Sequence, residues 1–152
     1  MKDKGIMSCC GFGNRQIFED IRNNVYQTVN EMVERGCRIF YTGAMGDFDR
    51  LFVDAVRQAK HNCFDIKLLC VMPYMTNSIN KNKDYLYSVY DDIIIPTELM
   101  GIHYKSAIKK RNQWIIDQSD TVIIYSLRTF GGAYDAMKYA EKTGKTILQI
   151  LK

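Results

Sequence analysis

Short runs of apolar residues alternate with amphipathic stretches along this chain, and this alternation limits the fold more than any other feature. The predicted strands are Gly5–Cys10, Cys37–Tyr41, Ile66–Met72, Ile93–Ile95, Thr121–Leu127 and Thr146–Leu151. Because these strands are apolar throughout, both faces of the sheet that they form must be covered. The pattern therefore predicts an α/β fold with a mostly parallel sheet between two layers of helices.

Apolar residues at helical spacing predict the helices between these strands. The first helix begins near Gln16 and stops at Gly36, and the others are Asp47–His61, His103–Gln118 and Ala133–Lys142. The polar segment Tyr74–Asp92 is difficult to assign, although Asp84–Tyr90 is consistent with one or two helical turns. Because no linker or repeat interrupts the 152 residues, we expect a single domain, 1–152.

Charge and cysteine usage narrow the classes of function. A net charge of +4 suits an anionic small ligand and is weaker than the basic footprint of a dedicated nucleic-acid binder. No signal peptide is recognisable, and no apolar stretch approaches the roughly 20 residues of a membrane span. We expect a cytoplasmic protein without membrane contact.

The sequence suggests neither a metal site nor a cofactor. The five cysteines form no CxxC pair and lie mostly in apolar runs, so we interpret them as reduced core thiols. A reactive role for Cys9 and Cys10 stays open. The two histidines, His61 and His103, stand in no metal-ligand pattern.

Three glycine-containing turns follow predicted strands. They are Gly11–Arg15, Gly43–Gly46 and Gly131-Gly132, and the last lies within the strand–turn–helix stretch Asp120–Gly144. Glycine lets a ligand approach the bare backbone, and the N–H groups at a helix N-terminus attract anions. In parallel sheets ligands bind beyond the carboxyl ends of the strands. The turns therefore predict a phosphate or nucleotide site on this rim.

Arg111 projects from the apolar face of the helix His103–Gln118. An unpaired buried charge is costly, so Arg111 should meet a ligand anion or a carboxylate. The alternatives are an ion pair with Asp49 or Asp120, or a side chain that extends to solvent. Three lysines lie nearby: Lys105, Lys109 and Lys110. We interpret Lys109 and Lys110 as part of a solvated helix face.

Other residues near the turns allow two interpretations. Asp47 and Asp49 lie at the start of a predicted helix, where they cap it or interact favourably with its dipole. The alternative is that they hydrogen-bond to a ribose or pair with Arg111. Asp135 lies in the first turn of its helix, where the dipole role is favoured. For Tyr134 and Trp114 we expect core packing, and stacking on a base is the alternative.

Four stretches in this order resemble the YpsA-like branch of the SLOG superfamily, which groups the LOG nucleotide-processing proteins with DNA-processing protein A. They are GFGNRQIFED, FYTGAMGDFDRLFVDAV, VMPY and KKRNQWIIDQSDTVIIYSLRTFGGAYDAMKYAEKTGK, and the resemblance extends from Gly5 to Ile150. It implies a Rossmann-like three-layer sandwich with a nucleotide site on the strand rim. The matching positions, which the resemblance implies are ligand-binding, are Gly11, Arg15, Thr42, Gly43, Gly46, Asp49, Arg111, Asn112, Gly131 and Gly132.

The chain departs from the LOG pattern after the glycine pair. LOG proteins, which hydrolyse the N-glycosidic bond of nucleoside monophosphates, continue with Gly-Thr and a catalytic glutamate. This chain has Tyr134-Asp135 and then Met137-Lys138 in those places. Glycoside hydrolysis needs a carboxylate near the anomeric carbon. The catalytic residue is therefore unassigned, with Asp49 and Asp135 as weak candidates.

The favoured function is the binding or sensing of a nucleotide-derived small molecule, such as an ADP-ribose-like or nucleoside phosphate ligand, at the carboxyl rim of the sheet. One alternative is a LOG-type nucleotide hydrolase, so whether the protein is an enzyme stays open. The second alternative, a protein associated with single-stranded DNA, is disfavoured by the modest charge. Assembly into a homo-oligomer also stays open.

Overall fold

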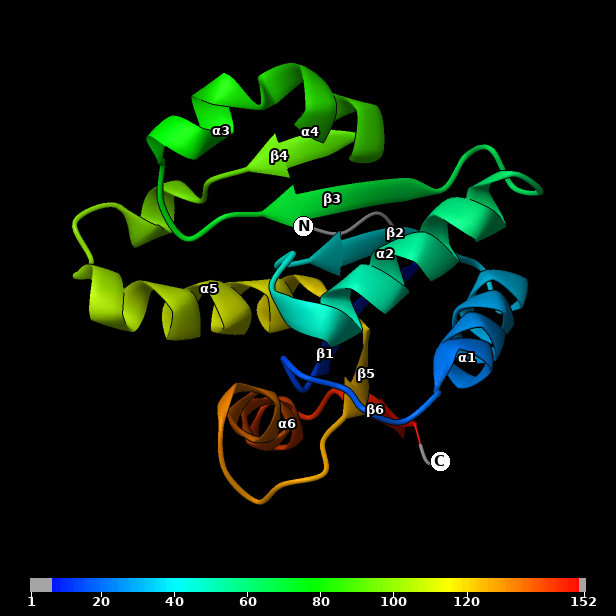
Figure 1. Ribbon diagram of the computed structural model, residues 1–152. Helices are drawn as coiled ribbons and strands as arrows, with labels where there is room; N and C mark the ends of the chain where they lie inside the picture. Colours follow the sequence, from blue (N-terminus) through cyan, green and yellow to red (C-terminus); the bar gives the residue numbers. More distant parts are fainter. Residues whose placement is uncertain (1–6, 151–152) are drawn as a thin grey trace.

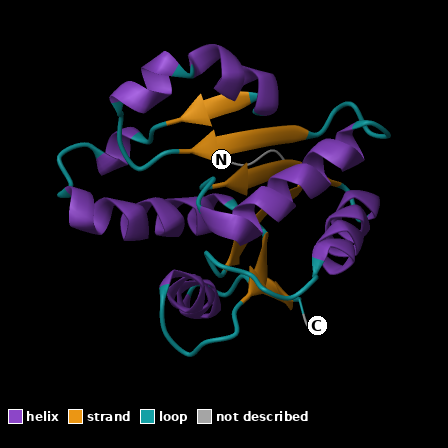
Figure 2. Ribbon diagram, viewed as in Figure 1, coloured by secondary structure: helices purple, strands orange, loops and turns teal. Residues whose placement is uncertain are grey.

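The computed structural model describes residues 7–150, which form an α/β fold around one parallel sheet (Figures 1 and 2). The strand order β4-β3-β2-β1-β5-β6 places β1 beside β5, more than half the chain away in sequence. The strands are β1 (Met7–Gly13), β2 (Cys37–Thr42), β3 (Lys67–Val71), β4 (Asp92–Ile94), β5 (Thr121–Tyr125) and β6 (Thr146–Gln149).

Helices cover both faces of this sheet, so the predicted three-layer α/β sandwich is confirmed (Figure 1). One face is covered by α1 and α2, and the other by α5 and α6, while α3 and α4 lie beside the edge strand β4. The helices are α1 (Arg22–Glu34), α2 (Gly46–Lys60), α3 (Asn77–Lys81), α4 (Lys83–Val89), α5 (Tyr104–Gln118) and α6 (Gly132–Lys142), with a 3₁₀ turn at Thr97–Leu99. Among the described residues, no helix has the length and apolar character that a membrane span requires.

Neighbouring residues of β1 belong to opposite sides of the core. Cys9 packs in the cluster that contains Phe48 and Phe52 of α2, whereas Cys10 packs with Ile115 of α5 and Ala136 of α6. All six side chains are completely or almost completely buried. This alternation explains why the strands are apolar at every position, since each successive side chain enters a different buried layer.

The region after β1 corrects two predictions. The strand continues through Gly13, so Gly11 lies within the sheet, and α1 begins at Arg22 instead of near Gln16. The backbone of the intervening segment bonds to distant groups. The Asp47 N–H donates to the Arg15 carbonyl over 2.8 Å, and the Ile17 N–H donates to Asp47 Oδ2 over 2.9 Å. These bonds hold residues 14–20 as a loop.

The other elements match their predicted ranges within two residues, except at the chain ends. The difficult segment contains α3 and α4, which confirms the helical turns predicted at Asp84–Tyr90. The predicted boundaries Gly5 and Leu151 lie outside the described residues. β5 ends at Tyr125, two residues earlier than predicted, and leaves a longer loop before α6.

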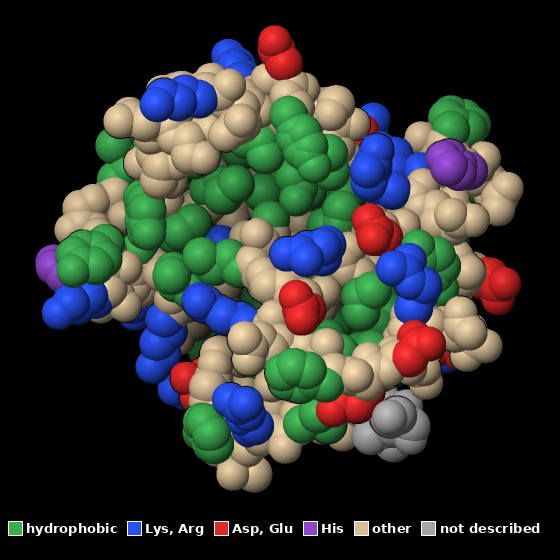
Figure 3. Space-filling view, in the orientation of Figure 1, with side chains coloured by type: hydrophobic (Ala, Val, Ile, Leu, Met, Phe, Trp, Pro, Cys, Tyr) green, Lys and Arg blue, Asp and Glu red, His purple; other side chains and the backbone are tan. Residues whose placement is uncertain are grey.

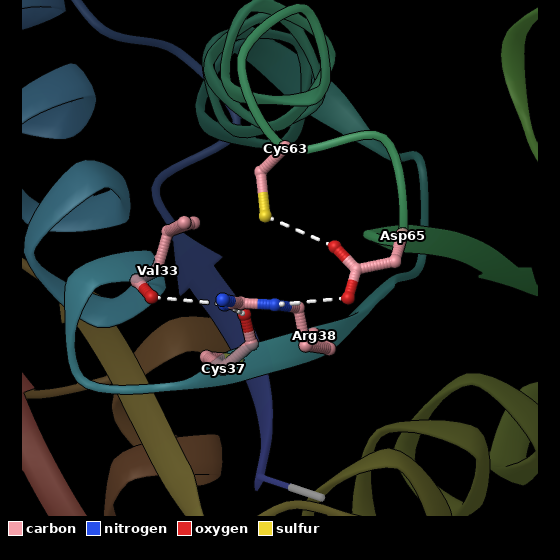
Figure 4. A network of polar contacts seen from close by, with 5 residues as sticks. All are labelled: Val33, Cys37, Arg38, Cys63 and Asp65. Carbon is pink, nitrogen blue, oxygen red and sulfur yellow. Dashed lines mark hydrogen bonds and ion pairs between the residues drawn. The ribbon is translucent and has the colours of Figure 1, made fainter.

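A polar network fixes the rim where the strands begin (Figure 4). Arg38, in β2, donates from Nη1 to the carbonyls of Val33 (2.9 Å) and Cys37 (2.8 Å), and its Nε lies 3.4 Å from Asp65 Oδ2. The Cys63 thiol donates to Asp65 Oδ1 over 3.0 Å. The network joins the end of α1 to the turn before β3. The network therefore lies on the rim opposite the carboxyl ends of the strands.

The chain leaves β1 and β5 toward opposite faces of the sheet. β1 leads to α1 on one face, and its neighbour β5 leads to α6 on the other. Two adjacent parallel strands whose connections diverge leave a crevice beyond their carboxyl ends, where ligands bind in open α/β sheets. The loops after β1 and β5 are therefore the expected walls of a site.

Candidate functional site

A cavity of about 260 Å³ occupies this crevice. The loops after β1, β2 and β5 meet there with the start of α6 and one side of α5. Its lining residues are Phe12, Gly13, Asn14, Arg15, Gly43, Met45, Asp49, Ile108, Arg111, Asn112, Arg128, Phe130, Gly131, Gly132 and Ala133. The structure thus brings together Arg15, Gly43, Asp49, Arg111, Asn112, Gly131 and Gly132 from the ligand-binding set that the resemblance implied.

Arg111 extends from α5 into the wall of this cavity and is only 2% exposed. Its Nη1 donates to the carbonyls of Val71 (2.9 Å), the last residue of β3, and Gly43 (3.3 Å), the first residue after β2. Its Nε donates to Asn112 Oδ1 over 2.8 Å. The remaining nitrogen, Nη2, meets the Met45 thioether at 3.1 Å, a weak acceptor. Arg111 therefore ties strand ends together and keeps donor capacity at Nη2.

The positive charge of Arg111 has no carboxylate within ion-pair distance among residues 7–150. Asp49 lines the same cavity and attracts the guanidinium at longer range. Asp120 lies at the amino end of β5, on the opposite rim, where it accepts from the Ser8 N–H over 2.9 Å. Of the sequence alternatives, a direct salt bridge of Arg111 with either aspartate is not what the structure shows.

Asp49, in the first turn of α2, is a buried carboxyl group. It is 8% exposed, and its Oδ2 accepts from the Met45 N–H over 2.7 Å. Burial raises its pKa to about 6, although the Met45 hydrogen bond and the charges of Arg111 and Arg15 act in the opposite direction. Asp49 is therefore ionised at neutral pH and becomes protonated in mild acid.

Glycines at the ends of β1 and β2 are required by close packing. A Cβ on Gly43 would lie 2.8 Å from Arg111 Cζ, and one on Gly13 would lie 2.2 Å from Phe48 Cγ. Both residues line the cavity, so the close approach of their neighbours shapes its walls. Substitution at Gly43 would displace the guanidinium.

Three residues of the implied set lie outside the cavity and shape its surroundings. Gly11 packs against Phe52, and a Cβ there would lie 2.8 Å from Phe52 Cδ1. Thr42 is fully buried and accepts from the Ala44 N–H over 3.1 Å. Gly46 has a φ of 89°, and a Cβ there would lie 2.7 Å from Arg15 Cα.

Gly131 and Gly132 begin α6 on the far side of the cavity. Gly131 has a φ of 96°, which favours glycine, and no side chain caps the helix. A Cβ on either glycine would meet nothing within 4 Å. The first N–H groups of a helix lack partners within the helix and carry its positive dipole end. The open backbone at this point is suited to an anion.

Sequence reasoning missed Asn14, Arg128 and Phe130 as parts of the cavity wall. Asn14 Oδ1 accepts from the Leu127 N–H over 3.2 Å, which joins the loops after β1 and β5. The Arg128 guanidinium lies over the Phe130 ring, 5.5 Å from its centroid. Their positions in the loops that follow β1 and β5 were a usable signal, because neighbouring parallel strands end on one rim.

The remaining candidates lie away from the cavity. Asp135 is absent from the cavity lining and lines the neighbouring groove between α5 and α6. Trp114 packs against the core, with its Nε1 donating to Glu98 Oε2 over 2.7 Å, and Tyr134 lies beside the Lys138 ammonium. Among the described residues, no group of three His, Cys, Asp or Glu side chains is arranged for a metal ion.

Replacing Asp49 with asparagine should change how stability depends on pH. Because the folded-state pKa of about 6 lies above the ordinary 3.8, the carboxyl stabilises the fold fully below about pH 4 and loses this contribution as pH rises through 6. The change is about 3 kcal/mol, since one pKa unit corresponds to about 1.4 kcal/mol. Urea unfolding at about pH 3 and at about pH 7 should show wild type losing that much stability relative to Asp49→Asn. If the unfolding free energies of the two proteins depended on pH in the same way, this prediction would be contradicted.

Searches with the whole chain find no matching protein-family model and no matching curated protein. Solved structures do match. DNA processing protein A from Streptococcus pneumoniae gives a TM-score of 0.67 at 14% identity, over 95% of this chain and 50% of that one. DNA processing protein A from Helicobacter pylori, described with a unique single-stranded DNA binding mode, gives a TM-score of 0.64 at 17% identity. The match covers 94% of this chain and 64% of that one.

A third similar structure is the molybdenum cofactor binding protein from the phototrophic bacterium Rippkaea orientalis, with a TM-score of 0.61 at 17% identity, over 97% of this chain and 77% of that one. This chain spans about half the length of the Streptococcus pneumoniae protein and just under two thirds of the Helicobacter pylori protein. At these identities the likeness shows a common fold.

Proposed function

We propose that this protein binds a nucleotide-derived small molecule, such as an ADP-ribose-like or nucleoside phosphate ligand, with a phosphate group at the N-terminus of α6. One observation carries the proposal: the uncapped, glycine-lined start of α6 and the buried Arg111 face a common cavity where β1 and β5 diverge. The DNA processing protein A fold accords with the SLOG resemblance, and the YpsA-like branch is proposed from the motifs.

The charges around the cavity favour an anion. Arg15, Arg111 and Arg128 line it, whereas Asp49 is the one acidic residue in its described lining. Arginine remains charged at any physiological pH and matches the oxygens of phosphate well. Burial lowers the dielectric around Arg111, which strengthens its attraction for a phosphate that displaces water from the cavity.

Hydrolysis of the bound nucleotide is the second candidate, and the position of Asp49 favours it. A carboxyl group with a pKa of about 6 on the cavity wall has the acidity that general acid–base chemistry near neutral pH needs. Asp135, the other weak candidate, lies outside the cavity. Release of free base from nucleoside monophosphates by wild type, but not by Asp49→Asn, would establish this activity.

Binding of single-stranded DNA is supported less well. On the face seen in Figure 3, basic and acidic side chains are interspersed and form no continuous basic surface. Nucleic-acid affinity depends on phosphate contacts by many lysines and arginines. The cavity arginines suit one or two phosphate groups better than a long strand.

The substitution Gly132→Asp should separate ligand binding from folding. A carboxylate in the first turn of α6 interacts favourably with the helix dipole, by about 0.3–1 kcal/mol, and the position has room for a side chain. The same negative charge would repel a phosphate. In thermal-shift assays with AMP, ADP and ADP-ribose, we expect unliganded Gly132→Asp to melt no lower than wild type and to lose the ligand-induced shift.

Gly132→Asn is the matched control, because asparagine has the shape of aspartate without its charge. It should keep more of the ligand response than Gly132→Asp. A full ligand-induced shift in the aspartate variant would place the phosphate elsewhere and contradict the proposal.

A further inference from the structure

A second cavity, of about 280 Å³, lies between α5 and α6 beside the charged one. The two helices pack side by side on the same face of the sheet (Figure 1). Ile108, Asn112 and Gly132 line both cavities, so the two spaces meet along these residues. We call the second cavity the α5–α6 groove.

The interior of the groove is apolar. Ile116 and Ala136 are 0% and 4% exposed and lie on facing sides of the two helices. Tyr139 completes this side, and its hydroxyl donates to Asp117 Oδ1 over 2.8 Å, which fixes the ring. The small residues Gly132 and Ala136 lie four positions apart on one side of α6 and leave the space open.

Polar groups surround this apolar interior. Gln113 and Asp135 line the groove, and Lys105 and Lys109 are exposed at its edge. This combination can bury the faces of a planar ring while amide, carboxylate and ammonium groups meet hydrogen-bonding atoms on the ring's edge. The groove therefore has the features of a site for a heteroaromatic ring.

Asn112 is the polar residue at the junction of the two cavities. Its Oδ1 accepts from Arg111 Nε over 2.8 Å, which orients the side-chain amide. The amide nitrogen has no hydrogen-bond partner within residues 7–150. A donor at the junction can bond to a group that connects the phosphate to the ring, such as a ribose hydroxyl.

We propose that the α5–α6 groove binds the nucleobase of the ligand whose phosphate lies at the start of α6. The inference depends on the proposed function, because it needs the phosphate in the first cavity. Each cavity alone is smaller than the roughly 300–1,000 Å³ of ordinary small-molecule sites, whereas the two together fall within that range. A nucleotide would occupy both spaces, with Asn112 between its base and its phosphate.

Calorimetric titrations with AMP, GMP, CMP, UMP and ribose phosphate test this assignment. Wild type should bind at least one of the nucleotides about tenfold more tightly than ribose phosphate, because the sugar phosphate leaves the apolar groove unfilled. Ala136→Leu fills the groove from α6. Gln113→Trp covers it from a half-buried position on α5 and is the second variant if the leucine disturbs packing.

Both variants should bind ribose phosphate like wild type and lose the preference for the nucleotide. Equal wild-type affinity for ribose phosphate and all four nucleotides would overturn the groove assignment and leave the phosphate site intact. A preference that survives in a folded variant would also overturn it. Failure of wild type to bind any of the five compounds would count against the phosphate site itself.

Discussion

Arg111→Met is expected to weaken nucleotide binding and to destabilise the fold. Methionine fills part of the space but leaves the carbonyls of Val71 and Gly43 without their donor. A buried polar group that loses its partner costs about 1–3 kcal/mol, so we expect a loss of about 2–4 kcal/mol in the free energy of unfolding. Affinity for the best nucleotide should fall about 100-fold, because a charged donor to phosphate is removed.

Arg111→Lys is the control for this prediction. Lysine keeps the positive charge but cannot reproduce the forked geometry that reaches both carbonyls and Asn112. It should retain more affinity than methionine while still losing stability. Urea unfolding and calorimetric titration measure the two effects separately. Wild-type affinity in a folded Arg111→Met protein would remove Arg111 from the ligand site.

Gly13→Ala is expected to be the most destabilising single methyl addition in the cavity wall. The new Cβ would lie 2.2 Å from Phe48 Cγ and 2.5 Å from Phe48 Cβ. The Phe48 ring stacks with the rings of Phe52 and Tyr125, at centroid distances of 6.2 and 6.4 Å, so it has little room to move. We expect a loss of about 3 kcal/mol or more in unfolding free energy.

Gly132→Ala provides the matched control, since it adds the same methyl group where no atom lies within 4 Å. Its stability should stay within about 0.5 kcal/mol of wild type, or rise slightly through the lower entropy of the unfolded chain. Urea denaturation of wild type, Gly13→Ala and Gly132→Ala measures the three free energies of unfolding. Equal stability of the two variants would mean that β1 and α2 are not packed as described.

Much of the fold followed from local pattern in the sequence. Cys9 and Cys10 enter opposite core layers, so an apolar strand did indicate a sheet covered on both faces. Arg111 stood out because a charged residue interrupted an apolar helix face, and it is indeed buried. Both inferences depend only on the period of the element that carries the residue.

The parts that sequence reasoning missed depend on contacts between distant segments. Apolar spacing from Ile17 onward suggested a helix, but Asp47 binds the Ile17 N–H and holds a loop there. Arg111 donates to backbone carbonyls at the carboxyl ends of β2 and β3, and no side-chain pattern reveals these bonds. Asn14 joins the cavity through Leu127, 113 residues away. Such pairings are set by strand order, which the sequence pattern does not specify.

Both proposals require that a phosphate group binds at the start of α6 beside Arg111. Backbone amide NMR shifts recorded during titration with AMP test it most directly. We expect the largest changes at the N–H groups of Gly132 and Ala133, with smaller changes around Asn112 in the helix opposite. Saturable changes centred on another part of the molecule, or no change at millimolar AMP, ADP or ADP-ribose, would contradict it.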